Sequence, residues 1–545
     1  MIRISIFLLS LVVLAGCFKT EEADTILHNG TIYSIDELNT VYQAIAIKDG
    51  KIIALGAERE ILNKYSAPQV IDVQKQFVYP GFIDGHAHFL GYGLNKQEAD
   101  LVGTGSHQEL LRRVKSYRDE HDNKNWIVGR GWDHTAFEEQ SLPSRTLLDS
   151  VFPNTPVFLM RVDGHAALVN SKAIELAEIS VKSTVEGGKY QLDDQGELTG
   201  ILIDNAMNKV RALIPSPDEE TIRQALQDAE KDCFAAGLTT VTDAGVHHEV
   251  VSLIENMHEQ KTLKMRVYAM LSNKQENFDV FLSKGSLQTP RLTVSSFKFY
   301  GDGALGSRGA CMLEPYSDSP QEQGFLMYDY AYYEEYAQKL FDAGFQMNTH
   351  CIGDSANRTI LDIYADVLGG VNDRRWRIEH AQVVHPEDIH KFGDYGIIPS
   401  VQPTHATSDM RWAEDRLGKD RIQHAYAYRD LMDQLGILTL GTDFPVERIY
   451  PLETFYAAVA RKDRSGNPEN GFLPEQKLSR LAALKGMTIY AAIANFEEEK
   501  KGTLELGKYA DMVVLDRDIL KVAEDDILST KIKMTIVDGE VVYRK

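Results

Sequence analysis

The middle of the chain alternates apolar strands with helices, from residue 81 to about residue 499. One helix is expected to begin at Ser216, whose side chain would cap its first turn, and to end at Gly237, where the next strand begins. The same strand–helix order recurs from residue 297 to residue 441. Alternation over this length requires a parallel sheet, and a closed (β/α)8 barrel is the commonest way to complete one. The sequence therefore predicts an α/β fold with a TIM barrel over residues 81–499.

Short β-strands are expected at both ends of the chain. Residues 25–80 and 500–545 contain apolar segments separated by Asn-Gly and Asp-Gly pairs, which favour tight hairpin turns. Because both ends have this pattern, we expect them to form one small composite β-sandwich domain. The stretch from about residue 100 to residue 215 is longer than a barrel connection needs and contains a strand of its own. We interpret it as an insertion over the barrel mouth.

The N-terminus has the layout of a secretory signal. Arg3 precedes an apolar run over residues 4–14, which is too short to span a membrane, and small residues then precede Cys17. This layout resembles a bacterial lipobox, which implies that residues 1–16 are removed, Cys17 is lipidated and residues 17–24 form a tether. The protein would then be anchored to the bacterial cell envelope, on the periplasmic side or at the cell surface. An ordinary signal peptide that ends near a cysteine is the alternative.

The net charge and the cysteine content exclude two features, a nucleic-acid partner and a disulfide framework. The formal net charge of −22 argues against a nucleic-acid partner, because a phosphate backbone needs a basic face. Besides Cys17 the chain has only Cys233, Cys311 and Cys351, which are too scattered to form a disulfide framework.

Four of the expected barrel strands end in residues that can bind a metal ion. His86 and His88 are two residues apart, so on an extended strand their side chains share one face. A His-x-His pair is a weak signal by itself, but barrel active sites lie at the C-terminal ends of strands. Nitrogen and carboxylate ligands suit zinc best, with iron or manganese as alternatives. The residues at the other three strand ends are His350, His380 and Asp443.

Lys298 lies within a strand, between two aromatic residues. A lysine pointing into the barrel would lose hydration, so the side chain either faces outward, pairs with a carboxylate, or is carboxylated by carbon dioxide and bridges two metal ions.

The residues that follow, 301–306, match the Gly-x-Gly-x-x-Gly pattern of dinucleotide sites. A loop is expected after them instead of a helix, and without a helix N-terminus there is no phosphate cradle.

Together these motifs resemble the amidohydrolase superfamily, and in particular the branch similar to N-substituted formamide deformylase (amidohydrolase family 3, YtcJ-like). The likeness runs from about residue 25 to the C-terminus. It rests on the phrases at residues 81–88, 163–165, 298–307, 349–354, 377–382 and 441–446.

The resemblance implies a metal-dependent hydrolase that cleaves a carbon–nitrogen bond other than a peptide bond in a small-molecule amide, such as an N-substituted formamide or an N-acyl amine. One or two divalent ions, zinc by preference, would activate water, and Asp443 would act as general base and then as general acid. The implied metal ligands are His86, His88, Lys298, His350, His380 and Asp443, with Lys298 in a plain or carboxylated form. Further candidates, for substrate contact or for orienting the ligands, are Trp132, His165, Asp302 and Gln382. For Trp132, a place in a hydrophobic core is the alternative.

Two alternatives stay open at this point. A cyclic amidase or a deaminase would use the same metal ligands on a different bond. A non-catalytic lipoprotein that binds a metal ion or a small molecule would have the same barrel without turnover. A homodimer is compatible with either.

Overall fold

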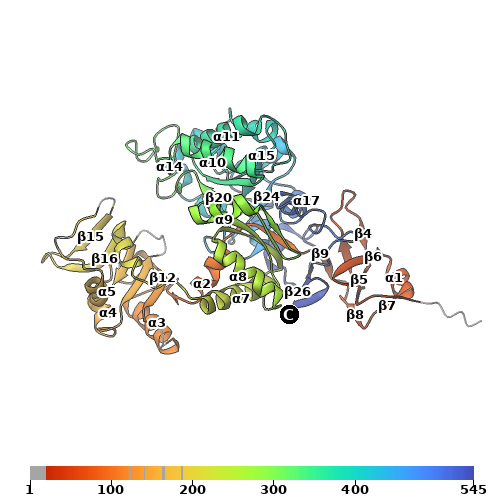
Figure 1. Ribbon diagram of the computed structural model, residues 1–545, viewed down its shortest axis with the longest axis horizontal. Helices are drawn as coiled ribbons and strands as arrows, with labels where there is room; N and C mark the ends of the chain where they lie inside the picture. Colours follow the sequence, from red (N-terminus) through yellow and green to blue (C-terminus); the bar gives the residue numbers. More distant parts are fainter. Residues whose placement is uncertain (1–19, 122–124, 140, 162–165, 186–187) are drawn as a thin grey trace, which may run out of the picture.

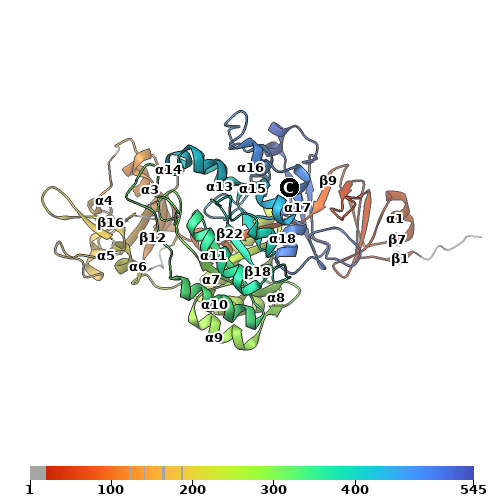
Figure 2. The ribbon, with the colours of Figure 1, turned by 90° about the horizontal axis from the view of Figure 1, so that it is seen from above.

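The computed structural model describes residues 20–121, 125–139, 141–161, 166–185 and 188–545. The signal segment, Cys17 and His165 lie outside these residues. Three bodies follow one another along the long axis: an insertion lobe at one end, a central barrel, and a β domain at the other end (Figure 1). The perpendicular view gives the same order (Figure 2).

Parallel strands form the central sheet in the order in which the chain supplies them, β10-β17-β18-β20-β21-β22-β23-β24. The short β19 (Leu287–Gln288) pairs with β20 in the antiparallel sense. This sheet confirms the expected (β/α)8 barrel. The strands are β10 (Phe82–Ala87), β17 (Leu238–Val246), β18 (Arg266–Ser272), β20 (Leu292–Tyr300), β21 (Gln346–Cys351), β22 (Arg377–His380), β23 (Ile398–Val401) and β24 (Thr439–Leu440).

Helices follow most barrel strands and cover the outside of the sheet. The helix α7 (Glu219–Ala235) is capped by Asp218, whose carboxylate accepts a hydrogen bond from Thr221 N at 2.8 Å. The expected cap at Ser216 is therefore wrong: the carboxylate of Asp218 is the group within reach of the free backbone N–H. The other barrel helices are α8 (His248–Glu259), α9 (Gln275–Lys284), α10 (Tyr330–Ala343), α11 (Asp354–Leu368), α12 (Lys391–Asp394), α13 (Pro403–Asp409), α14 (Ala413–Arg421), α15 (Tyr428–Leu435), α16 (Pro451–Ala460), α17 (Arg480–Gly486) and α18 (Ile489–Ala494).

Strands from both chain ends pair with one another in the β domain. Its two sheets have the orders β6-β5-β2-β8 and β27-β26-β25-β9-β3-β4, and apolar residues from both sheets form one buried cluster. The strands are β2 (Thr25–His28), β3 (Thr31–Tyr33), β4 (Val41–Tyr42), β5 (Ala44–Lys48), β6 (Lys51–Gly56), β8 (Gln69–Asp72), β9 (Phe77–Pro80), β25 (Met512–Leu515), β26 (Ile532–Val537) and β27 (Glu540–Arg544).

The insertion lobe is built on a six-stranded mixed sheet with the order β11-β12-β13-β14-β16-β15. It follows α2 (Phe89–Asn95), so it is attached at the C-terminal end of β10 (Figure 1). Its strands are β11 (Ala99–Asp100), β12 (Ile127–Trp132), β13 (Val157–Arg161), β14 (Ala166–Val169), β15 (Gly188–Leu192) and β16 (Leu198–Asp204).

Hydrogen bonds join the first barrel strand to the segment that follows the last one. Asp443 N donates to His86 O, and His88 N donates to Phe444 O, both at 2.8 Å. The buried Asp84 carboxylate adds to this link, because it accepts from Thr442 Oγ1 at 2.7 Å and from Thr442 N at 3.0 Å.

Glycine lets these two segments approach closely. A Cβ atom at Gly441 would lie 2.5 Å from His86 N, and a Cβ atom at Gly85 would lie 2.9 Å from Leu440 O. Any side chain at Gly441 would therefore push the backbone at His86 away.

The Thr442→Val variant tests the contribution of this closure. Removing the hydroxyl group leaves Asp84 Oδ2 without its donor inside the protein, so we expect the free energy of unfolding to fall by about 1–3 kcal/mol. Urea unfolding measures it, with Thr442→Ser, which keeps the hydroxyl group, as the matched control. Equal stability of the valine variant and the unchanged protein would contradict the assignment.

Candidate metal centre

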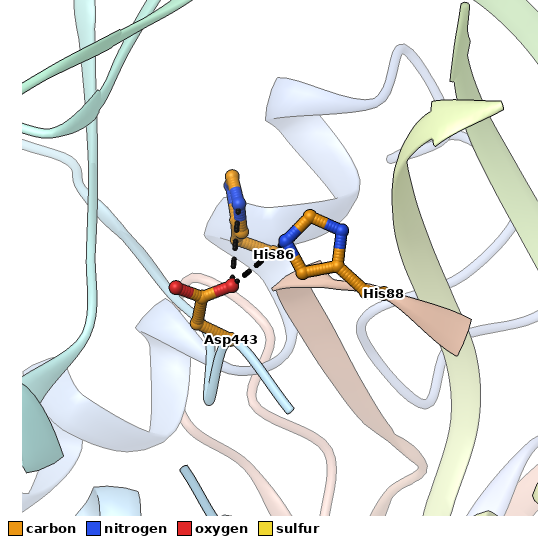
Figure 3. Close-up of side chains that lie close together, drawn as sticks. All are labelled: His86, His88 and Asp443. Atoms are coloured by element: carbon orange, nitrogen blue, oxygen red, sulfur yellow. Dashed lines mark ion pairs between the residues drawn. The ribbon is translucent and has the colours of Figure 1, made fainter. Parts of the chain in front are cut away.

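Three of the expected ligands meet at the C-terminal end of β10. His86 lies in β10, His88 is the residue before α2, and Asp443 follows β24. Asp443 Oδ1 lies 3.1 Å from His88 Nε2 and 3.7 Å from His86 Nε2 (Figure 3). One ligand atom from each residue lies within 4.8 Å of the other two, a spacing that allows them to hold one metal ion.

Asp443 also belongs to a second group of potential ligands. One ligand atom each from His380, His405 and Asp443 lie within 4.8 Å of one another. Asp443 Oδ2 is 3.6 Å from His405 Nε2, and the rings of His380 and His405 stack with centroids 5.8 Å apart. His405 was not expected from the sequence, because it lies in α13, beyond the end of β23. The sequence feature that could have identified it as a ligand is its position about one turn after a barrel strand.

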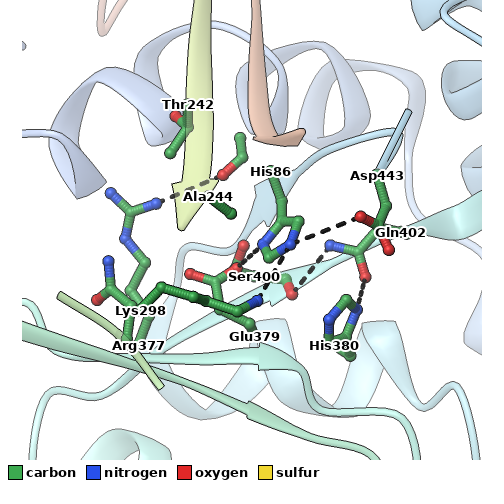
Figure 4. Close-up of polar contacts among 12 residues, drawn as sticks. His86, Thr242, Ala244, Lys298, Arg377, Glu379, His380, Ser400, Gln402 and Asp443 are labelled. Atoms are coloured by element: carbon green, nitrogen blue, oxygen red, sulfur yellow. Dashed lines mark hydrogen bonds and ion pairs between the residues drawn. The ribbon is translucent and has the colours of Figure 1, made fainter. Parts of the chain in front are cut away.

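Lys298 and His350 border these groups without belonging to either. Lys298 is 1% exposed and points into the barrel, with Nζ 3.2 Å from His86 Nε2 (Figure 4). The ring of His350 contacts that of His380 at a centroid distance of 4.5 Å. The strand ends therefore bring all six expected ligands to one region.

Hydrogen bonds at Nδ1 orient three of the imidazoles. The acceptors are the Glu379 carboxylate for His86, at 2.5 Å, and Gln402 Oε1 for His380, at 2.7 Å (Figure 4). For His88 the acceptor is the Ala244 carbonyl, at 3.1 Å. When Nδ1 carries the proton of the neutral ring, Nε2 keeps its lone pair and faces the centre of the site. Second partners of this kind are typical of histidines that bind metal ions.

The electrostatics of the site favour neutral imidazoles. Burial, together with Lys298, lowers the pKa of His86 and lowers that of His350 to about 3. Burial and the neighbouring His350, His86 and Lys298 also lower the pKa of His380. His88 differs, because Asp443 at 3.1 Å outweighs burial and raises its pKa. Neutral imidazole is the form that binds a metal ion.

The carboxylates of the site stay ionised. Burial by itself would raise the pKa of Glu379, but His86 and the cations Arg377 and Lys298 outweigh it and lower the pKa to about 2. At Asp443 the neighbouring imidazoles outweigh burial in the same way, and its pKa lies below the usual range. Burial lowers the pKa of Lys298, so its amine loses a proton more readily than that of a lysine in water.

Two nitrogen atoms of the cluster have no hydrogen-bond partner. Nε2 of His350 and Nε2 of His405 are both buried and make no hydrogen bond among the described residues, with carboxylate oxygens of Asp302 and Asp443 at 3.7 and 3.6 Å. Buried polar atoms are rarely left unsatisfied, and an imidazole nitrogen with a free lone pair is a metal ligand. A divalent cation bound among neutral imidazoles and the Asp443 carboxylate would satisfy them, so the residues present fit such an ion.

The other candidates from the sequence have different places. Trp132 is fully buried in the insertion lobe, and its indole N–H donates to Leu159 O at 2.8 Å, so the expectation that it contacts substrate is corrected: it packs in the core of the lobe. Asp302 accepts hydrogen bonds from the backbone N–H groups of Cys311, Ile352 and Gly353 at 2.8–3.0 Å and so holds the turn after His350.

Gln382 links β22 to the helix that carries His405. Its Nε2 donates to Tyr426 OH at 2.7 Å and to Asp409 Oδ2 at 3.1 Å, and Asp409 is the last residue of α13. His165 lies outside the described residues, so its expected contact with substrate stays a prediction.

The Glu379→Gln variant tests how His86 is oriented. Loss of the carboxylate weakens the partner of Nδ1, so we expect zinc affinity to fall by about 10- to 100-fold, the usual cost of removing such a partner. Competition with a chromogenic chelator measures the affinity. Glu387→Gln, at a carboxylate with 79% side-chain exposure, is the control, and an unchanged affinity at Glu379→Gln would refute the role.

Comparison with known proteins agrees with this site. The model of the amidohydrolase family matches residues 69–543. Among curated relatives, Protein LONG AFTER FAR-RED 3 of Arabidopsis thaliana is 32% identical over 96% of this chain and 92% of its own length. Putative amidohydrolase YtcJ of Bacillus subtilis is 30% identical (95% and 99% covered), and N-substituted formamide deformylase of Arthrobacter pascens is 25% identical (96% and 99%).

The solved structure of an uncharacterized metal-dependent hydrolase from Pyrococcus horikoshii has a TM-score of 0.79 and 28% identity, with 92% of this chain and 99% of that chain covered. The family match extends over most of the chain and includes every residue of the candidate metal centre. The chain belongs to the amidohydrolase family and is related to metal-dependent hydrolases.

Proposed function

We propose that the protein hydrolyses a carbon–nitrogen bond other than a peptide bond in a small amide, such as an N-substituted formamide or an N-acyl amine, with zinc as its metal. The observation that carries the proposal is the buried group of neutral imidazoles around the ionised Asp443. The relative named N-substituted formamide deformylase supports the substrate class.

Each residue of the site has a role in this reaction. His86, His88 and Asp443 would hold the ion, and the ring of His380 lies beside them, between those of His86 and His350. When bound, zinc supplies Lewis acidity toward a carbonyl oxygen and toward water. Asp443 has a second oxygen, Oδ2, directed away from His86 and His88, which can accept a proton and return it to the leaving nitrogen.

Lys298 is the residue whose chemical form matters most. Its side chain is buried beside His86, and burial lowers its pKa, so its amine loses a proton more readily than that of a lysine in water. A neutral amine adds to carbon dioxide, and we propose the resulting carbamate as the form that contributes a negative charge to the site. A protonated Lys298 would instead repel a bound cation.

The Asp443→Asn variant tests the catalytic role. We expect kcat for the best substrate in a panel of N-formyl and N-acyl amines to fall by about 100- to 10,000-fold, because the amide cannot accept the proton. Metal content is measured in the same samples by mass spectrometry, so loss of catalysis is separated from loss of the ion. Asp525→Asn, at an exposed carboxylate, is the control.

The same panel of substrates, extended to cyclic amides, aminopurines and esters, also distinguishes the alternative functions. Turnover of cyclic amides or aminopurines in place of N-acyl amines would change the substrate class and keep the metal site. No turnover on any amide, cyclic amide, aminopurine or ester by metal-loaded protein would overturn the proposed function.

We further propose that Cys17 is lipidated and anchors the protein to the cell envelope. In the part of the chain that the structure describes, no helix has the length and apolar character needed to cross a membrane. We expect Cys17→Ser to move the protein from the membrane fraction to the soluble fraction and to abolish labelling by a palmitate analogue. Membrane attachment that persists in this variant would contradict the proposal, and Cys233→Ser, at a buried thiol, is the control.

A further inference from the structure

We propose that a cavity between the barrel and the β domain binds an organic anion, a small molecule with a carboxylate or phosphate group and an apolar body. The cavity lies where the end of α7, the start of α16 and the strands β26 and β27 meet. None of the described residues that line it belongs to the candidate metal centre. The inference therefore goes beyond the proposed function and does not depend on it.

The size and the walls of the cavity suit a small molecule. Its volume is about 380 Å³, and ligand pockets typically have about 300–1,000 Å³ and often lie where domains meet. The strands β26 and β27 of the β domain lie beside α7 of the barrel (Figure 1), so both domains contribute to the lining. Pro451, Leu452, Leu528 and Ile532 form an apolar part of the wall, which can contact an apolar ligand body.

Basic side chains outnumber carboxylates in the lining. Arg448, Arg464 and Lys531 line the cavity, whereas Glu453 is the one carboxylate side chain among its described residues. In the whole chain the acidic residues outnumber Lys and Arg by 80 to 58, so the balance in the cavity is the reverse of the average. Charges of one sign gathered in a hollow attract ions of the opposite sign. This balance favours an anionic ligand.

The two arginines share a single acceptor. Arg448 Nη1 lies 2.7 Å and Arg464 Nε lies 3.1 Å from the same oxygen atom, Glu453 Oε1. No other side-chain hydrogen bond or ion pair of these arginines is found in the part of the chain that the structure describes. Because each guanidinium group has five N–H donors, both keep donors for a further carboxylate or phosphate.

Contacts on the first turn of α16 hold the cationic wall in place. The guanidinium group of Arg448 lies over the ring of Tyr450, 4.4 Å from its centroid, and Glu453 is only 15% exposed. A guanidinium group that is already positioned loses less conformational freedom when it binds an anion. Lys531 is exposed, has no ion pair with any other described residue, and adds a further positive charge.

The experiment is a calorimetric titration of the metal-loaded full chain with 6-bromo-2-naphthoate and with 6-bromo-2-naphthyl phosphate. We expect one equivalent of at least one of them to bind, and the tighter of the two identifies the preferred charged group. Arg464→Gln and Lys531→Gln should each weaken this binding by at least about 10-fold, because each removes a charge-assisted hydrogen bond. Arg112→Gln, at an arginine of the insertion lobe with 75% side-chain exposure, should bind as the unchanged protein does.

Smaller and neutral probes test the two halves of the ligand separately. Acetate and inorganic phosphate lack the apolar body, and 6-bromo-2-naphthylmethanol lacks the charge. We expect each to bind at least about 10-fold more weakly than the organic anion. Equal binding of the small anions would contradict a role for the apolar wall, and equal binding of the alcohol would contradict a role for the cations. Either result would overturn the inference.

A crystal grown with the tighter probe locates it without any variant. Anomalous scattering from bromine should place the probe in the cavity, with its charged group toward Arg448 and Arg464. A bromine peak at the metal centre and not in the cavity would overturn the inference. So would failure of both probes to bind the unchanged protein, or unchanged affinity in both cavity variants once circular dichroism has shown that they are folded.

Discussion

The hydrogen bonds between the first barrel strand and the segment after the last one both close the barrel and assemble the site. Asp443 N donates to His86 O, so the residue that closes the sheet also brings its carboxylate to the imidazoles of His86 and His88. Asp84 strengthens this link from within the barrel through Thr442. The tight approach is possible because Gly441 has no side chain. The ligands on the other strands face the same position, which this hydrogen bond fixes.

The site combines charge, burial and backbone strain. Glu379, Lys298 and Asp443 are all buried, and burial of charges is tolerated only when partners compensate for the lost hydration. His380 and Asp443 also have positive φ angles, 74° and 59°, which cost on the order of 1–3 kcal/mol each for residues other than glycine. Such conformations persist because the surrounding hydrogen bonds, to Gln402 and to His86 O, hold them in place.

Much of the fold could be predicted from the sequence, because strand–helix alternation has few physical solutions. The same periodicity placed His86, His88, His350, His380 and Asp443 at strand ends. It could not find His405, because a histidine one turn into a helix has no periodic signature that marks it as facing the site. It could not decide the place of Trp132, because an aromatic residue in an insertion packs according to tertiary contacts within the lobe. The hydrogen-bond partners at Nδ1 could not be predicted from the sequence either. Ala244 and Gln402 belong to neighbouring strands or turns, and the register of the strands decides which atoms meet.

Because β9 pairs with a C-terminal strand, the fold can be completed only after the C-terminal residues have been synthesised. Val78 of β9 pairs with Val514 of β25, so one edge of β9 has no partner until the C-terminal residues have left the ribosome. An unpaired apolar strand is prone to aggregate, and a chain of this architecture exposes one throughout translation. β9 ends only two residues before β10 begins. Truncation of the last strands would therefore also remove β25, the strand that pairs with the segment leading into the first barrel strand. The integrity of the candidate metal centre thus depends on strands far from it in the sequence.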